Sequence, residues 1–89
     1  MKAVITVIGQ DKVGILYNVA EVLAGKNVNI LDVNQTIMQG IFTMVMVVDL
    51  AGATIPFEEL QRLLDERGRS IGMSIRIQHE GIFNAMSEL

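Results

Sequence analysis

Hydrophobic and polar positions follow two different periods along this chain. Four stretches have the β-branched, extended character of strands, and two others repeat apolar residues at the three- and four-residue spacing of an amphipathic helix. The predicted strands lie at about 2–8, 28–38, 41–49 and 73–79. The first helix is predicted at about 12–24, and the second is predicted to begin near Pro56. The element order is therefore βαββαβ, in which the second helix ends between residues 68 and 72.

Turn-forming residues mark where these elements begin and end. Gln39 and Gly40 predict a tight reversal that makes the second and third strands a hairpin. Asp11 is expected to cap the start of the first helix, so that its replacement by alanine costs ~1 kcal/mol. Gly25 is expected to be the C-cap of that helix, and Pro56 suits the start of the second helix.

The strand patterns also predict which strands are central. The first and third are apolar on both alternating sets, as expected of strands that are buried on both faces. The fourth alternates cleanly between apolar and polar residues and the second does so partly, which is typical of edge strands. The prediction is an α+β fold, the ferredoxin-like sandwich with antiparallel sheet order 4-1-3-2 and two helices on one face.

The other face of such a sheet needs a cover, and an identical subunit is the expected one, since symmetric pairing is the commonest oligomeric solution. A short C-terminal helix is predicted to add a further apolar patch. Its residues are Ile82, Phe83, Met86 and Leu89. A homodimer or a higher homo-oligomer is therefore expected.

Composition narrows the class of protein. With 89 residues, 51% of them hydrophobic, the chain is expected to be a single domain over residues 1–89. A net charge of −3 gives no electrostatic basis for binding nucleic acid, and Arg62, Arg67 and Arg69 are expected on a solvated helix face. The apolar run after Lys2 is too short for a signal peptide or a membrane span, so a cytoplasmic location without a membrane is expected.

Groups that perform catalysis or bind metals are scattered in this sequence. The chain has no cysteine, and its single histidine, His79, stands beside Glu80 without the further ligands that a metal site needs. Met38, Met44 and Met46 are better explained as pliable core residues than as copper ligands. The serines have no histidine and aspartate relay. The sequence therefore predicts neither an enzyme nor a metal site, and no cofactor.

The turn between the first strand and the first helix holds the densest set of backbone groups suited to a ligand. Gly9 and Gly14 allow close approaches and unusual backbone angles, and the amides at a helix start attract anions such as an amino-acid carboxylate. The turn lacks the third glycine and the Gly-Lys-Ser/Thr ending of nucleotide-binding motifs. A small-anion site and a plain structural turn both remain open. Asn29 and Asn34 carry amides that can recognise a ligand, although Asn29 can equally just begin its strand.

This turn and its flanks resemble the opening half of an ACT domain, a small regulatory module that binds amino acids and related effectors. The resemblance rests on residues 7–16, 19–24 and 27–32, and the later half of the chain also fits in order and length. It is closest to the stand-alone ACT proteins of the UPF0237 group. The glycine cleavage system repressor and the N-terminal module of formyltetrahydrofolate deformylase are more distantly similar.

The resemblance implies an effector site between subunits, made by the first loop of one chain and the start of the second strand of its neighbour. The residues implied are Gly9, Gln10, Asp11, Lys12, Val13, Gly14, Ile15, Leu16, Asn29 and Ile30. Val13 departs from the family pattern, where many members have proline, so specificity for serine or glycine does not follow.

The leading hypothesis is a non-enzymatic, cytoplasmic regulatory protein that binds an amino acid at a dimer junction and passes its occupancy to a protein partner. The alternative is a homodimeric assembly module without a small-molecule ligand, in which the loop residues merely pack. RNA binding on this topology would require exposed aromatic residues on the central strands, where only Phe42 occurs. Acyl-phosphate hydrolysis would require an arginine in the first loop, where only Lys12 is basic.

Overall fold

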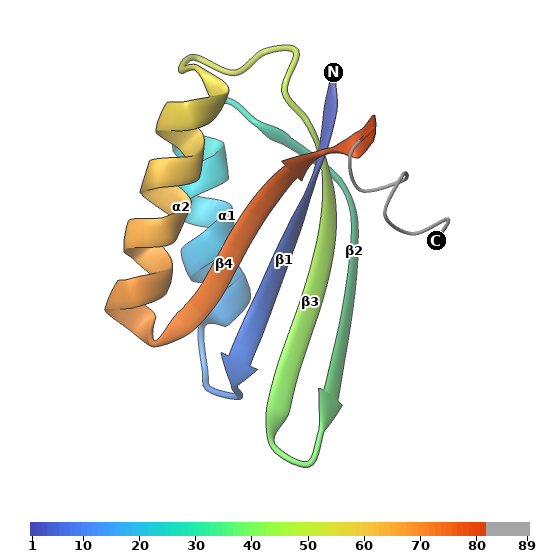
Figure 1. Cartoon of the computed structure of the whole chain (residues 1–89), viewed down its shortest axis with the longest axis vertical. Coiled ribbons are helices and arrows are strands. Elements are labelled where there is room, and N and C mark those ends of the chain that lie inside the picture. Colours follow the sequence, from blue (N-terminus) through green and yellow to red (C-terminus); the bar gives the residue numbers. More distant parts are fainter. Residues whose placement is uncertain (82–89) are drawn as a thin grey trace.

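The computed structural model describes residues 1–81 and confirms the βαββαβ order (Figure 1). The elements are β1 (Lys2–Gln10), α1 (Ile15–Gly25), β2 (Asn29–Met38), β3 (Ile41–Asp49), α2 (Phe57–Ile71) and β4 (Met73–His79). The predicted C-terminal helix with its apolar patch lies outside the described residues. Among the described residues, no helix is long and apolar enough to cross a membrane.

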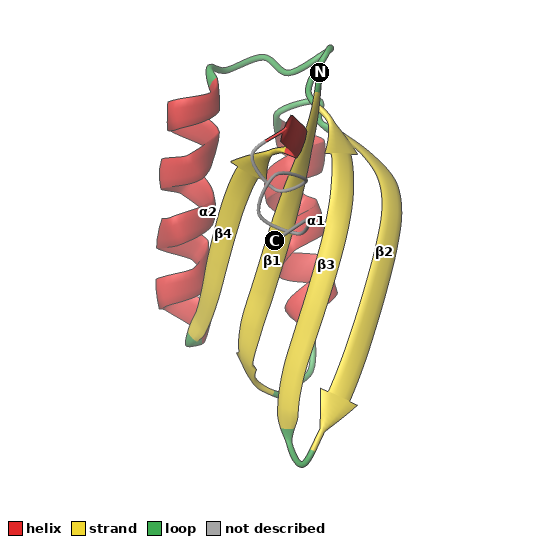
Figure 2. Ribbon diagram, turned by 45° about the vertical axis from the view of Figure 1, so that its right-hand side comes forward, coloured by secondary structure: helices red, strands yellow, loops and turns green. Residues whose placement is uncertain are grey.

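The four strands form one antiparallel sheet in the order β2-β3-β1-β4, with both helices on one face (Figure 2). This is the predicted order 4-1-3-2 counted from the opposite edge, so the ferredoxin-like fold is confirmed. β1 and β3 are central, and β2 and β4 are the edges, as the strand patterns indicated.

The core lies between the sheet and the two helices. Alternate residues of the central strands face the helices and are fully buried; they are Ala3, Ile5, Val7, Met44, Met46 and Val48. On the opposite face, Val4 is buried and Val45 and Val47 are half-buried, whereas Ile8 is 46% exposed. The prediction that both faces of β1 and β3 are buried therefore holds for the helix-facing side and only in part for the other side in a single chain.

The start of α1 corrects two predictions. The helix begins at Ile15 rather than near residue 12, and its N-cap is Gly14, with φ 88° and no capping side chain. The prediction that Asp11 caps the helix is wrong. Because Gln10 still pairs with Ile41 in the sheet, the chain needs the residues up to Gly14 to turn before a helix can form.

The end of α1 corrects a third prediction. Gly25 is the last helical residue and Lys26 is the C-cap, with φ −112°. The left-handed residue is Asn27, with φ 58°, and its side-chain Nδ2 donates a hydrogen bond of 2.9 Å to the carbonyl oxygen of Gly52. Asparagine adopts this conformation more readily than most other residues, so glycine is not required where the chain leaves α1.

The other predicted turns are confirmed. Gln39 and Gly40 have φ values of 51° and 81°, as both central residues of a type I′ hairpin turn require. Pro56 is the N-cap of α2, and Gly72 ends that helix in the left-handed conformation with φ 72°.

β2 is more exposed than its partial alternation suggests. All of its residues are exposed except Ile30, which is half-buried. A register shift between Ile30 and Asp32 leaves Leu31 without a partner on β3. Leu31 therefore does not belong to the alternating apolar positions of β2 that include Val33 and Ile37. The edge strand therefore carries apolar side chains in contact with solvent.

Candidate functional site

The first loop, residues 11–14, joins β1 to α1 beside the β2–β3 turn (Figure 1). The backbone amide of Asp11 donates to the carbonyl oxygen of Gly40 at 3.0 Å. Lys12 Nζ donates to the carbonyl oxygen of Ile71 at 2.6 Å. Ile71 is the last residue of α2, where the negative end of the helix dipole favours a cation. The loop is thus fastened to two elements that are distant in sequence.

The first backbone amides of α1 have no capping side chain. The first amides of an α-helix have no intrahelical acceptor, and here the N-cap Gly14 supplies no side chain to bind them. Ile15 is buried in the core and offers only its backbone, whereas Leu16 is 41% exposed and Val13 is fully exposed. An added Cβ on Gly14 would meet only Asn18 Nδ2, at 3.7 Å, so glycine is needed there for its φ and not for packing.

Gly9 has a different reason to be glycine. It lies within β1 on the helix-facing set, opposite Phe42 and Met73. An added Cβ would lie 2.5 Å from Met73 Sδ and 3.3 Å from the carbonyl oxygen of Gly72. The close approach that this glycine permits is therefore to the start of β4.

The second part of the predicted site lies at the far end of the sheet. Gln10 pairs with Ile41 at one end of β3, and Asn29 pairs with Asp49 at the other end. Eight steps along β3 separate these two positions, which is roughly 26 Å at 3.3 Å per residue. A single chain therefore does not bring Asn29 and the half-buried Ile30 near the first loop.

Asn29 is exposed and borders a shallow hollow of about 440 Å³. The hollow is lined by Ala24, Asn27, Val28, Asn29, Asp49 and Gly52. Asn29 is therefore accessible to solvent at this hollow.

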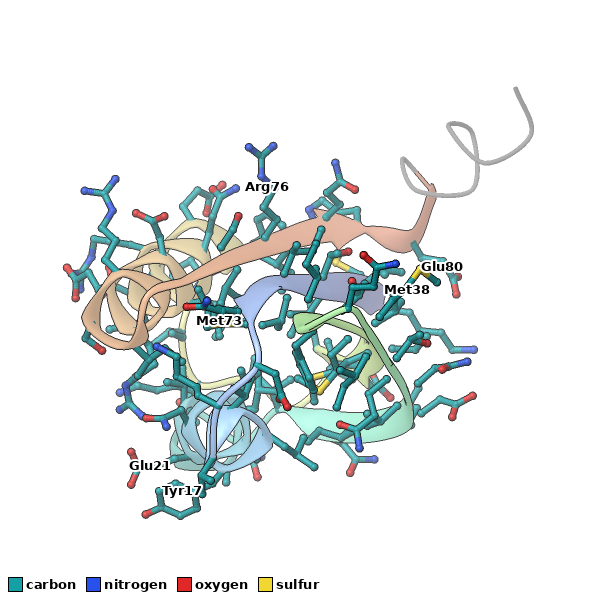
Figure 3. The ribbon with its side chains drawn as sticks, turned by 90° about the horizontal axis from the view of Figure 1, so that it is seen from below. Tyr17, Glu21, Met38, Met73, Arg76 and Glu80 are labelled. Atoms are coloured by element: carbon teal, nitrogen blue, oxygen red, sulfur yellow. The ribbon has the colours of Figure 1, made fainter. Side chains whose placement is uncertain are left out.

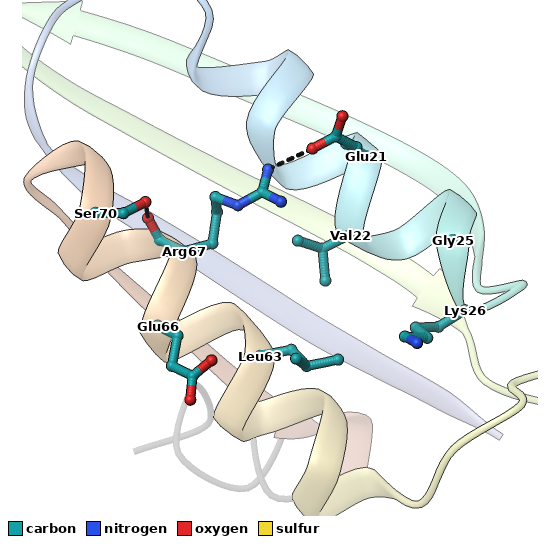
Figure 4. Close-up of a pocket in the computed structure, with 8 residues that line it drawn as sticks. All are labelled: Glu21, Val22, Gly25, Lys26, Leu63, Glu66, Arg67 and Ser70. Carbon is teal, nitrogen blue, oxygen red and sulfur yellow. Dashed lines mark hydrogen bonds and ion pairs between the residues drawn. The ribbon is translucent and has the colours of Figure 1, made fainter.

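A larger groove, of about 520 Å³, runs between the two helices (Figure 4). Its lining residues are Glu21, Val22, Gly25, Lys26, Leu63, Glu66, Arg67 and Ser70. Arg67 bridges the groove, since its Nη1 lies 2.8 Å from Glu21 Oε1 and donates to the backbone oxygen of Asn18 at 3.1 Å. The prediction that this arginine lies on a solvated face is wrong, because its side chain is only 29% exposed.

The other two arginines of α2 do lie on the solvated face. Arg62 pairs with Glu59 and Glu66, and Arg69 pairs with Asp65, all within α2. Arg67 differs because its acceptors lie on α1, a tertiary contact that the sequence pattern of α2 alone does not reveal.

Glu21 is the acceptor that connects Arg67 to Tyr17. The two side chains at positions 17 and 21 extend together from α1 (Figure 3), and Tyr17 Oη donates to Glu21 Oε2 at 2.9 Å. Hydrogen bonds from Arg67 and then from Tyr17 hold the pKa of Glu21 below its ordinary 4.5. The hydrogen bond to Glu21 also raises the pKa of Tyr17 above 10.0.

The single histidine packs against an aromatic ring. The rings of His79 and Phe57 stack with centroids 4.1 Å apart and planes inclined by 20°. In the part of the chain that the structure describes, no group of three or more His, Cys, Asp or Glu side chains is arranged to hold a metal ion.

Comparison with known proteins places these features in context. A family model described as the ACT domain matches residues 2–78. A UPF0237 protein of Clostridium acetobutylicum is 53% identical over 89 residues, which cover 100% of both chains. Among solved structures, an ACT domain protein from Streptococcus pneumoniae is 37% identical with a TM-score of 0.82, and the match covers 93% of each chain.

A more distant structure shares the fold alone. A protein described as a glycine cleavage system transcriptional repressor is 22% identical with a TM-score of 0.73, and the match covers 86% of this chain and 44% of that one.

Proposed function

This chain belongs to the ACT domain family, and on that premise we propose that it is a regulatory protein that binds an amino acid between two identical subunits. The observation that carries the proposal is the separation of the two parts of the site. The first loop and Asn29 lie at opposite ends of β3 in one chain, so a second chain has to supply the missing part.

Antiparallel pairing of two β2 edges supplies the missing part. In such a pair, the Asn29 end of one strand lies against the Met38 end of the other. The first loop is at the Met38 end of its own chain, because Asp11 is bonded to Gly40. Asn29 and Ile30 of the neighbour then come to the same end of the joined sheet as the first loop.

The exposed surface of β2 supports this pairing. Its apolar side chains are 36% to 68% exposed; they are Leu31, Val33, Ile37 and Met38. A long, apolar edge strand offers unpaired backbone groups to another strand, which soluble proteins usually avoid or cover. A symmetric partner covers both the edge and its apolar side chains.

Each part of the site has a role in binding. The amides of Ile15 and Leu16 attract the carboxylate of the ligand, since they lie at the positive end of α1. The carbonyl oxygen of the Asn29 amide accepts from the ammonium group. A ligand that contacts both chains stabilises the arrangement in which the two parts meet, and this difference in affinity is the signal that a protein partner detects.

Calorimetric titration with each of the twenty amino acids tests the proposal. We expect heat from at least one of them, and no heat at millimolar concentration contradicts the proposal. Sedimentation of the full chain is expected to show a dimer, and Val33→Lys, which places a charge on the apolar edge, is expected to shift it towards monomer.

Mixing two variants tests whether the site is shared between chains. Gly14→Val disrupts the loop and Asn29→Ala removes the amide, so each homodimer should lose binding. A mixed dimer made by unfolding and refolding the two variants together contains one intact site and should regain binding. Failure to regain it, with both variants folded by circular dichroism, argues for a site within one chain.

The apolar edge of β2 also favours a second candidate, a homodimeric assembly module without a small-molecule ligand. In that case the chain is a dimer in sedimentation, yet gives no heat with any amino acid. Gly14→Val then lowers the free energy of unfolding, because valine is strained at φ 88°, and changes no binding.

A further inference from the structure

A chain of hydrogen bonds joins α2 to the first loop through Asn18. Arg67 Nη1 donates to the backbone oxygen of Asn18 at 3.1 Å and lies 3.3 Å from its Oδ1. Asn18 Nδ2 donates to the carbonyl oxygen of Gly14 at 2.8 Å, and the backbone amide of Asn18 donates to the same oxygen at 3.0 Å. The Gly14 carbonyl therefore has two donors from one residue, and that residue is bonded to Arg67.

The guanidinium acts together with the Gly14 carbonyl on the orientation of the Asn18 amide. Arginine only donates hydrogen bonds, so the amide oxygen of Asn18 has to face it. The NH₂ group then points to the Gly14 carbonyl, which only accepts. A flipped amide would place donor against donor at Arg67 and acceptor against acceptor at Gly14. Arg67 and the Gly14 carbonyl thus favour the same one of the two amide orientations.

The Gly14 carbonyl in turn sets the direction of the next amide. Because a trans peptide is planar, the C=O of Gly14 and the N–H of Ile15 point in opposite directions. With the carbonyl held towards Asn18 along the helix, the Ile15 N–H points away from the helix and out of its start. The hydrogen bonds of Arg67 are therefore transmitted to the first amide of α1.

The last turn of α2 holds the loop at a second point. Arg67 and Ile71 are four residues apart and lie on one side of α2, and the carbonyl oxygen of Ile71 accepts from Lys12. One turn of α2 is thus bonded to the loop through Lys12 and to the helix start through Asn18. Arg69, in the same turn, pairs with Asp65 on its own helix.

We infer that Arg67 is a positioning residue of the effector site, which holds the Gly14–Ile15 peptide so that the Ile15 amide faces a bound carboxylate. The role in binding rests on the proposed function. The orientation of the peptide is a property of the free protein and can be measured without a ligand.

The test uses the full chain, labelled with ¹⁵N, as wild type, Arg67→Met, Arg67→Lys and Arg69→Met. Methionine keeps the apolar stem of arginine and removes its donors. In the free protein, Arg67→Met is expected to shift the signals of the Ile15 amide and of the Asn18 side-chain NH₂. Arg67→Lys retains one donor group and should restore part of each shift, and Arg69→Met should leave both signals unchanged.

A titration with sodium acetate, used as a carboxylate probe, then measures the effect on binding. Arg67→Met is expected to weaken the acetate response of the Ile15 amide by about three- to tenfold, the effect of losing roughly one hydrogen bond. Arg69→Met should respond as the wild type does. A general loss of helix packing would instead shift signals throughout α1 and α2.

The outcomes separate the two proposals. If Arg67→Met folds and its Ile15 and Asn18 signals are unchanged, the positioning role is overturned, regardless of the result of the acetate titration. If the free protein shows the expected shifts but wild type does not respond to acetate, the orientation by Arg67 stands and the carboxylate site fails. If Arg67→Met does not fold, a full set of wild-type signals in Arg67→Lys overturns the dependence on the guanidinium, and partial shifts support it.

Discussion

Gly68 allows α2 to lie directly against β4, and its replacement by alanine is the sharpest test of this packing. The residue is buried on the inner side of the helix. A Cβ added there would lie 2.6 Å from the backbone oxygen of Met73 and 3.1 Å from Cγ1 of Ile75. The first of these atoms belongs to the backbone of β4, so it cannot rotate away as a side chain can. Either α2 or β4 has to shift.

The expected magnitude is the difference between two opposing terms. Overpacking a well-packed core typically costs about 1–3 kcal/mol. Alanine in a helix interior is favoured over glycine by about 1 kcal/mol. Because the closest contact is to backbone, we expect Gly68→Ala to lower the free energy of unfolding by about 1–2 kcal/mol. For a domain of this size that corresponds to a decrease in Tm of about 4–16 °C.

Gly25→Ala is the matched control. Gly25 is the last residue of α1, and, apart from its chain neighbours and the backbone of its own helix, no described atom lies within 4 Å of an added Cβ. The same substitution should therefore leave stability unchanged or raise it by up to about 1 kcal/mol. Urea unfolding followed by circular dichroism measures both variants. A Gly68→Ala variant as stable as wild type would refute the argument, as would an equal loss in both variants.

Three further predictions concern the loop and the α1–α2 contact. Asp11→Ala should change the free energy of unfolding, measured by urea unfolding, by less than about 0.5 kcal/mol, because Asp11 does not cap α1. A loss near ~1 kcal/mol would instead show that Asp11 does act as a cap. Lys12→Met removes the hydrogen bond to the Ile71 carbonyl, so it should accelerate amide hydrogen exchange more in the first loop than in β1. An equal acceleration in both segments would contradict this. Because Arg67 lowers the pKa of Glu21, the ionised carboxylate adds stability above its unfolded pKa, near 4.5, and this is lost as pH falls through the folded pKa. The stability difference between wild type and Glu21→Gln should therefore be present at pH 7 and disappear in acid, and a difference independent of pH is the contrary result.

Sequence patterns predicted the elements that local signals define. Residues a few positions apart predict the hairpin turn at Gln39 and Gly40. They also predict the bounds of β3, β4 and α2. The prediction of where α1 begins was wrong because Asp11 and Gly14 can each occupy the N-cap position. Asp11 has the better capping side chain, but sheet pairing continues to Gln10 and leaves the cap to Gly14.

The candidate site was proposed from the sequence, but the bonds that hold its loop were not predicted. The loop stood out through its glycines and the following helix, both of which are local features. The bonds that hold it join Lys12 to Ile71 and Arg67 to Asn18, which are 59 and 49 residues apart. The spacing of α2 does separate Arg67, which lies three or four residues from Leu63, Leu64 and Ile71 on the apolar stripe, from Arg69, which follows Asp65 and Glu66 on the charged side. The acceptors of Arg67 lie on α1, and the spacing of α2 does not reveal them.

The distance between the first loop and Asn29 has a consequence for the way in which such a protein responds. In the proposed pair, each crevice draws on both chains, and occupying either one tightens the same contact. Ligand uptake and self-association are then linked equilibria, and each promotes the other. Under the proposed function, dilution of the protein lowers its apparent affinity for the amino acid, so the amount of the protein contributes to the threshold of the response.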